Sequence, residues 1–191
     1  MKKIFLVLLL FFGSINILNA EVNRIISGNK NAKITIIAYE SLTCSHCADF
    51  HKDVYPQLKK NYIDTGLVKI EFRHFPLDVA AFNASKISQC KTDQNLEILN
   101  SLYLNQKEWI KGSTVEEVNK NLKVFIENEG FKLNFEKCVN DKEIEDFVLN
   151  DRIEGVKKFK VNATPTIIIN DKKFEKTLNY KNLKKSLEKL I

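Results

Sequence analysis

Two cysteines and two histidines lie within eight residues of one another in the segment SLTCSHCADFH, which ends at His51. Cys44 and Cys47 have the Cys-x-x-Cys spacing that occurs in redox-active disulfides and in zinc sites, and His46 and His51 are two further candidate ligands. A structural zinc site usually takes its ligands from two separated segments, whereas these four residues belong to one turn and the helix after it. The segment therefore favours thiol-disulfide chemistry, and we predict no metal site.

The flanking residues predict a buried strand, a helix and a second strand. The run AKITIIAYES, residues 32–41, is apolar and rich in β-branched residues, as in strands covered on both faces. Apolar residues after the cysteines recur at helical spacing, with Pro56 predicting a kink and Gly66 the end of the helix. In LVKIEFRHF, residues 67–75, apolar and polar residues alternate, which predicts a second strand. This order predicts a βαβ unit with parallel strands. The apolar residues at helical spacing are Phe50, Val54 and Leu58.

Cys44 is expected at the N-cap of that helix, where free backbone N–H groups and the helix dipole favour a thiolate. The pKa of Cys44 should therefore fall below the usual value of about 8.5, and His46 in the first turn could lower it further. Cys47, one turn further into the helix, should keep the higher pKa. The difference predicts that Cys44 forms the mixed disulfide and that Cys47 resolves it. Two inert buried cysteines would fit an exposed helix start poorly.

A block of helical patterns, residues 79–150, follows the second strand. Ser113 and Glu116 have the spacing of a capping box, and Gly130 marks a helix end. We expect this block to be an insertion with its own small core. Its apolar faces carry Val118, Leu122, Phe125 and Ile126 in one helix, and Ile144, Phe147 and Val148 in another.

Strand signals return after Gly155. The turn residues Asn170 and Asp171 separate TPTIII, residues 164–169, from KKFEK, residues 172–176, and predict a β-hairpin. The predicted fold is α/β, with a mixed sheet formed by residues 21–78 and 151–191 and a helical insertion between them. A last amphipathic helix carries Leu183, Leu187 and Leu190.

The first 20 residues, MKKIFLVLLLFFGSINILNA, have the layout of a cleavable secretory signal peptide. Their apolar run is short for a membrane span. Removal of Lys2 and Lys3 with this segment would lower the formal net charge from +6 to +4. The other lysines are interspersed with acidic residues and do not form a basic block, so we expect no nucleic-acid partner.

The chain resembles the DsbA family of secreted thiol-disulfide oxidoreductases, which have a thioredoxin-like fold. The resemblance rests on the signal peptide, CSHC after a strand, FRHFPLD, the helical block and NATPT. The resemblance implies that Pro165 is cis and lies beside the active-site cysteines, and that the backbone of Thr164 pairs with a substrate peptide. An ordinary trans proline at a strand start is the alternative that spacing alone favours. The family dipeptide between the cysteines is Pro-His, so Ser45 here affects the redox potential.

A second departure concerns the acidic residue that the family often places under the resolving cysteine. That position is Ala38 here. Glu40 lies on the same side of the strand and is a possible substitute, although a partly exposed glutamate at the strand end is the simpler expectation. For His51 we expect a position on the helix surface, and for His74 a packed or capping role.

Cys90 and Cys138 remain if Cys44 pairs with Cys47, so their pairing is then fixed. A bond between them would close a loop of about 50 residues within the helical block and add roughly 4 kcal/mol on the chain-entropy model. Two free buried thiols are the alternative.

These features predict a periplasmic oxidase that donates the Cys44–Cys47 disulfide to exported proteins with free cysteines. The resemblance also implies a membrane quinone-linked partner that reoxidises it, and we expect no cofactor. Family isomerases carry an N-terminal dimerisation domain, and only about a dozen residues separate Ala20 from Ala32, which favours a monomer. An isomerase or reductase, a Cys/His metal-binding protein and a non-catalytic binding module are the alternatives.

Overall fold

The computed structural model describes residues 22–91 and 93–191. The predicted signal peptide, residues 1–20, lies outside the described residues. Within those two ranges, none of the helices is both long and apolar enough to cross a membrane.

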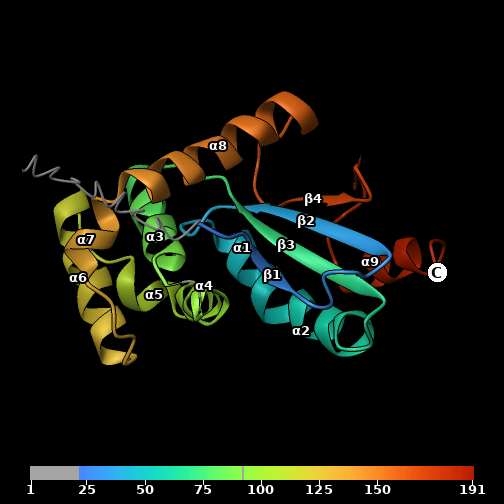
Figure 1. Ribbon diagram of the computed structural model, residues 1–191, viewed down its shortest axis with the longest axis horizontal. Helices are drawn as coiled ribbons and strands as arrows, with labels where there is room; N and C mark the ends of the chain where they lie inside the picture. Colours follow the sequence, from blue (N-terminus) through green and yellow to red (C-terminus); the bar gives the residue numbers. More distant parts are fainter. Residues whose placement is uncertain (1–21, 92) are drawn as a thin grey trace, which may run out of the picture.

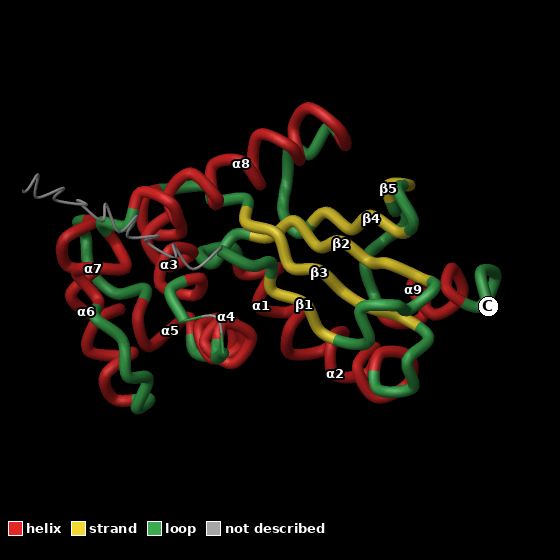
Figure 2. Tube along the Cα trace, viewed as in Figure 1, coloured by secondary structure: helices red, strands yellow, loops and turns green. Residues whose placement is uncertain are grey.

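A mixed five-stranded sheet forms the centre of the fold (Figure 2). The strand order is β1-β3-β2-β4-β5, and only β2 and β3 are parallel. The parallel pair and the hairpin were both predicted, and the predicted α/β class is confirmed. The short first strand was not predicted, and it pairs antiparallel with β3 at the sheet edge. The bounds are β1 Ile25–Ser27, β2 Ile34–Glu40, β3 Val68–His74, β4 Thr166–Ile169 and β5 Lys172–Lys173.

The helix after the cysteines is continuous but not regular. It consists of α1 (Ser45–Asp49), a π-helical turn (Phe50–Val54), α2 (Tyr55–Leu58) and a second π-helical turn (Lys59–Ile63). Pro56 lies in the first turn of α2, directly after the first π-helical turn. Because proline has no N–H to donate, a local change of helical hydrogen bonding is expected there.

Helices α3 to α7 gather at one end of the sheet. Helices α1 and α2 cover one face of the sheet, and α8 lies along the other face (Figure 1). The capping box of α6 is formed by Thr114 and Glu117, so the predicted pair Ser113 and Glu116 is wrong by one residue. The Thr114 hydroxyl accepts from the Glu117 N–H at 3.2 Å. The bounds are α3 Val79–Gln89, α4 Asn95–Leu104, α5 Gln106–Trp109, α6 Val115–Asn128, α7 Phe135–Val139 and α8 Lys142–Phe159.

Helix α8 runs without interruption through Asn150, where the sequence predicts the end of the insertion, and through Gly155. Gly155 is the point at which α8 approaches the sheet, because a Cβ there would lie 2.8 Å from Cε1 of Tyr39. The glycine therefore serves close helix-to-sheet packing and does not end the helix. The division of the chain into residues 21–78 with 151–191 and an inserted 79–150 stays a prediction.

The helical block does not have a separate core, contrary to the prediction. Buried side chains of α4 to α7, such as Leu102 and Leu122, belong to the same apolar cluster as Ile36 of the sheet. The reason is that α4 packs directly on β1 and on the helix after the cysteines. A second, smaller cluster under α8 contains Ile37, Tyr39, Phe75, Phe159, Val161 and Ile168.

The second pair of cysteines joins two elements of the helical block. Cys90 at the end of α3 is bonded to Cys138 of α7, with their Cα atoms 5.4 Å apart. At the other end of the chain, α9 spans Tyr180–Leu187. Leu183 and Leu187 are buried, whereas Leu190 is 48% exposed because the helix ends before it.

Candidate functional site

Cys44 lies where β2 passes through a short turn into α1. It is the N-cap residue of α1, with extended backbone angles (φ −81°, ψ 120°), as expected from the sequence. Its carbonyl accepts hydrogen bonds from the N–H groups of Cys47 at 3.1 Å and Ala48 at 3.2 Å. Both Cys44 and Cys47 are free thiols; the first is partly exposed and the second is fully buried. Only Cys44 is open to attack from solvent.

The two thiols differ strongly in acidity. The pKa of Cys44 is lowered to about 5, first because the Cys47 thiol forms a hydrogen bond to the Cys44 sulfur, while burial acts in the opposite direction. Hydrogen bonding with Thr164 and with the backbone N–H groups of Cys47 and His46 contributes to the same lowering. The pKa of Cys47 is raised, first by burial, then by its hydrogen bond to Cys44 and by the nearby Glu40. Near neutral pH, Cys44 is a thiolate and Cys47 a thiol.

Thr164 and Pro165 reach the cysteines from a distant part of the sequence. The Thr164–Pro165 peptide bond is cis, and the Cys44 sulfur lies 3.4 Å from the Thr164 carbonyl oxygen, to which it can donate only in its thiol form. Both residues lie directly before β4. Because β4 pairs antiparallel with β2, its start lies beside the C-terminal end of β2, where Cys44 follows. A groove of about 500 Å³ runs from Pro165 to His46 and extends to Leu178.

His46 and Ser45 lie on the surface of the first turn of α1. The His46 side chain is 81% exposed, and its Nδ1 lies 3.7 Å from the Asp49 carboxylate. Its backbone N–H contributes to the lowered pKa of Cys44. The Ser45 side chain lines a different groove, between α1 and the α4–α5 junction.

Glu40 and His51 form a buried pair beneath the cysteines, so the exposed positions expected for both are wrong. For Glu40 the alternative, a buried acid near the resolving cysteine, fits the structure. The side chains of Glu40 and His51 are 2% and 1% exposed, and His51 Nε2 lies 2.8 Å from Glu40 Oε2. His51 Nδ1 lies 3.0 Å from the Asn100 side-chain oxygen, and the ring stacks on Tyr103 at 4.1 Å. Burial raises the pKa of Glu40, while His51 acts in the opposite direction.

The Glu40–His51 pair also bears on the metal alternative. Both ring nitrogens of His51 have partners within the fold, and the His46 ring points to solvent. In the described ranges, no group of three or more His, Cys, Asp or Glu residues is arranged to hold a metal ion. The four residues of the opening motif therefore do not converge on one point.

His74, at the end of β3, has a packing role, as predicted. Its Nε2 accepts from the Gln89 amide at 3.0 Å, and burial lowers the pKa of His74 to about 3. Its backbone N–H donates to the buried carboxylate of Asp151 at 3.1 Å. A neutral imidazole with these fixed partners holds the sheet against α3 and α8.

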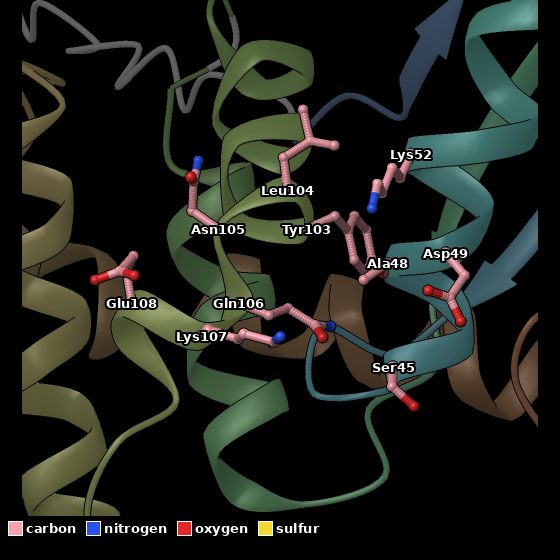
Figure 3. Close-up of a pocket in the computed structure, with 10 residues that line it drawn as sticks. All are labelled: Ser45, Ala48, Asp49, Lys52, Tyr103, Leu104, Asn105, Gln106, Lys107 and Glu108. Carbon is pink, nitrogen blue, oxygen red and sulfur yellow. The ribbon is translucent and has the colours of Figure 1, made fainter.

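A polar groove of about 400 Å³ lies between α1 and the α4–α5 junction (Figure 3). Ser45 lines it on the side of the cysteines, and Tyr103, Gln106 and Lys107 line it on the other side. The Gln106 amide donates to the carbonyl oxygens of Leu42 at 2.8 Å and of Cys44 at 3.0 Å. Gln106 is not recognisable in the sequence, because a lone glutamine 62 residues after Cys44 has no local pattern that indicates this contact.

The arrangement can carry out thiol-disulfide exchange. Cys44 offers a stabilised, accessible sulfur, and Cys47 offers a buried thiol that can close or open a disulfide with it. The backbone at Thr164 lies against the same sulfur and borders the groove of about 500 Å³.

Comparison with known proteins agrees with this geometry. A protein-family model described as Thioredoxin matches residues 20–189. A putative protein-disulfide oxidoreductase of Rickettsia bellii is 29% identical over 154 residues, which cover 78% of this chain and 58% of that protein. A second, from Rickettsia prowazekii, is 27% identical over 88% of this chain and 62% of its own length. This chain thus spans about 60% of the length of these Rickettsia relatives.

The crystal structure of Wolbachia pipientis α-DsbA1 superposes with a TM-score of 0.78 and is 31% identical, covering 88% of this chain and 90% of that chain. One thiol with a lowered pKa and one with a raised pKa lie at a strand-to-helix junction, with a cis-proline beside them. Together with this degree of similarity, the site shows that the chain belongs to the DsbA family of thioredoxin-like proteins.

Proposed function

We propose that the protein is a thiol-disulfide oxidase that donates a Cys44–Cys47 disulfide to exported proteins with free cysteines. The observation that carries the proposal is the difference in acidity between the two thiols. A low pKa of Cys44 stabilises the reduced form of the pair, and a disulfide with a stabilised reduced form is a strong oxidant.

The reaction proceeds in two exchanges. A substrate thiolate attacks the Cys44 sulfur, the Cys44–Cys47 bond breaks, and Cys47 leaves with the electron pair and takes up a proton, as its raised pKa favours. A second substrate thiolate then attacks the substrate sulfur that is bonded to Cys44. Cys44 leaves as a thiolate, which its low pKa makes a good leaving group. The substrate gains a disulfide, and the protein keeps two electrons in its cysteine pair.

Thr164 and Pro165 are proposed to bind the substrate segment next to its cysteine. The Thr164 carbonyl lies 3.4 Å from the Cys44 sulfur, so a peptide in a mixed disulfide would pass alongside this backbone. Main-chain pairing with an extended peptide requires no particular side chains, which suits a protein with many substrates. Ser45 and His46 would influence the redox potential as neighbours of Cys44.

The reduced pair must be oxidised again, and we propose a membrane quinone-linked protein as the oxidant. We place the protein in the periplasm, as a monomer. The Cys90–Cys138 disulfide supports an oxidising compartment, because stable disulfides are rare where thiols are kept reduced.

The test is equilibration of the protein, without its leader, in glutathione buffers of graded potential, followed by oxidation of a reduced, unfolded model protein. An oxidase has a Cys44–Cys47 potential more oxidising than the glutathione pool and forms disulfides stoichiometrically; Cys44→Ser loses this activity. A potential well below that of glutathione would identify a reductase. Reshuffling of scrambled disulfides without net oxidation would identify an isomerase.

A further inference from the structure

The turn that presents Cys44 is held by the helical block from two sides. On one side, the Thr43 hydroxyl donates to one carboxylate oxygen of Asp78 at 2.7 Å. The other oxygen of Asp78 accepts from the Ala81 N–H at 2.7 Å and caps α3. The start of α3 is therefore bonded to the residue that precedes Cys44.

On the other side, Gln106 uses one amide nitrogen to bond two carbonyl groups of the turn. Its Nε2 lies 2.8 Å from the Leu42 oxygen and 3.0 Å from the Cys44 oxygen. An amide NH₂ has two hydrogens, so both bonds can form at the same time. Figure 3 shows the Gln106 side chain extending from α5 toward the loop that leads into Ser45.

The Cys44 carbonyl is the first acceptor of α1, because it also receives the N–H groups of Cys47 and Ala48. Its direction fixes how the first turn of the helix is placed relative to the Cys44 side chain. The N–H groups of that turn, those of His46 and Cys47, are the ones that stabilise the sulfur. A group that fixes the position of this carbonyl therefore also fixes the position of the Cys44 sulfur relative to the N–H groups that stabilise it.

We propose that Gln106 is a positioning residue for disulfide exchange: its amide clamps the carbonyls of Leu42 and Cys44 and keeps Cys44 in the N-cap conformation. Gln106 does not touch the reacting sulfur; it acts through the backbone of Cys44. The helical block thereby contributes to the chemistry as well as to the surface around it. The inference rests on the exchange proposed at Cys44, but it holds for an oxidase and a reductase alike.

The test replaces Gln106→Met, which keeps the length of the side chain and removes both donors without adding a charge. The control is Lys107→Met, the same new side chain at the next position of α5, where the exposed lysine lines the same groove. Three quantities are compared: the pH titration of the Cys44 thiolate by ultraviolet absorbance, the kcat/KM for a dithiol peptide, and the hydrogen exchange of the Cys47 and Ala48 amides.

For Gln106→Met we expect the ionisation of Cys44 to shift about three- to tenfold toward the thiol, as the loss of one or two hydrogen bonds implies. The kcat/KM falls by a similar factor with little change in KM, and the Cys47 and Ala48 amides exchange faster. Lys107→Met keeps wild-type values.

The inference would be overturned if Gln106→Met kept the wild-type Cys44 titration and the wild-type exchange rates of the Cys47 and Ala48 amides. It would also be overturned if Lys107→Met changed these quantities and kcat/KM as much as Gln106→Met does. If Gln106→Met does not fold, the shorter Gln106→Asn replaces it, with the same expected direction and the same refuting outcome. Absence of exchange activity in the wild-type protein would refute the proposed function instead, while the Cys44 titration would still decide on the clamp.

Discussion

The low pKa of Cys44 makes the stability of the reduced protein depend on pH in a way that the oxidised protein cannot share. In the folded, reduced protein the pKa of Cys44 is about 5, whereas in the unfolded chain it is near the ordinary value of about 8.5. At pH 7 the thiolate therefore adds roughly 2.7 kcal/mol, at about 1.36 kcal/mol per pH unit over two units. Cys44 is partly exposed, so solvent screening reduces this to about 1–2 kcal/mol.

The sign follows from the direction of the shift. A group whose pKa is lowered by folding adds stability that is complete above its unfolded pKa and is lost as the pH falls through its folded pKa. For reduced Cys44, the gain therefore grows from pH 5 to about pH 8.5 and is absent at pH 4. The oxidised protein has no Cys44 thiol to titrate. The free energy of unfolding of the reduced form should thus rise with pH relative to that of the oxidised form.

The assay is urea unfolding of both redox forms between pH 4 and pH 8, with mass spectrometry to verify that Cys90–Cys138 stays bonded when Cys44–Cys47 is reduced. Cys44→Ser, which has neither the acidic thiol nor the disulfide, reports the pH dependence of the rest of the protein. A reduced-minus-oxidised difference that stays constant, or that falls with rising pH, would refute the reasoning about Cys44.

Three further predictions concern stability and can be checked by urea unfolding. Replacing Cys90→Ala and Cys138→Ala together removes a link across 48 residues and should cost roughly 4 kcal/mol; an unchanged midpoint would contradict this. His51→Ala leaves the buried Glu40 carboxylate without its partner and should cost about 3–5 kcal/mol at neutral pH, with partial recovery when Glu40→Gln is added. Gly155→Ala places a methyl group 2.8 Å from a ring carbon on β2 and should cost about 1–3 kcal/mol, whereas a neutral effect would show that α8 can move away.

The sequence identifies the reacting pair because the relevant signals are local. The apolar strand, the Cys-x-x-Cys spacing and the helix start are contiguous, so the N-cap position of Cys44 follows from short-range rules. The same holds for the hairpin turn, where Asn170 and Asp171 adopt the left-handed conformation expected of such residues.

The contacts that hold the reacting turn depend instead on tertiary packing. The Gln106 amide and the Asp78 carboxylate reach the turn from 62 and 35 residues away along the chain, by way of helices whose placement no local pattern specifies. The position of Thr164 beside Cys44 follows from the family resemblance and not from spacing. The separate core expected for the helical block fails for a related reason: hydrophobic periodicity predicts that a helix face is buried but not which element covers it.

Glu40 and His51 are a different case, because a signal for them was present in the sequence. The apolar residues after the cysteines recur every four residues, at Phe50, Val54, Leu58 and Tyr62, without the intervening three-residue step of a regular helix. In an α-helix each such step would drift by about 40° and carry the last residue off the buried face. The two π-helical turns widen the helix and keep all four buried.

The same widening turns a second row of side chains toward the sheet. His51, Tyr55 and Ile63, each one residue after a member of the first row, are buried as well. A regular helix read from Phe50 places His51 on its flank, which is why the surface position was expected. With the wider turn, the imidazole lies under β2 at 2.8 Å from the Glu40 carboxylate, and a buried charge acquires the partner that it needs. A strict four-residue repeat after a Cys-x-x-Cys motif is therefore a reason to search the residue after each repeat for a buried polar partner.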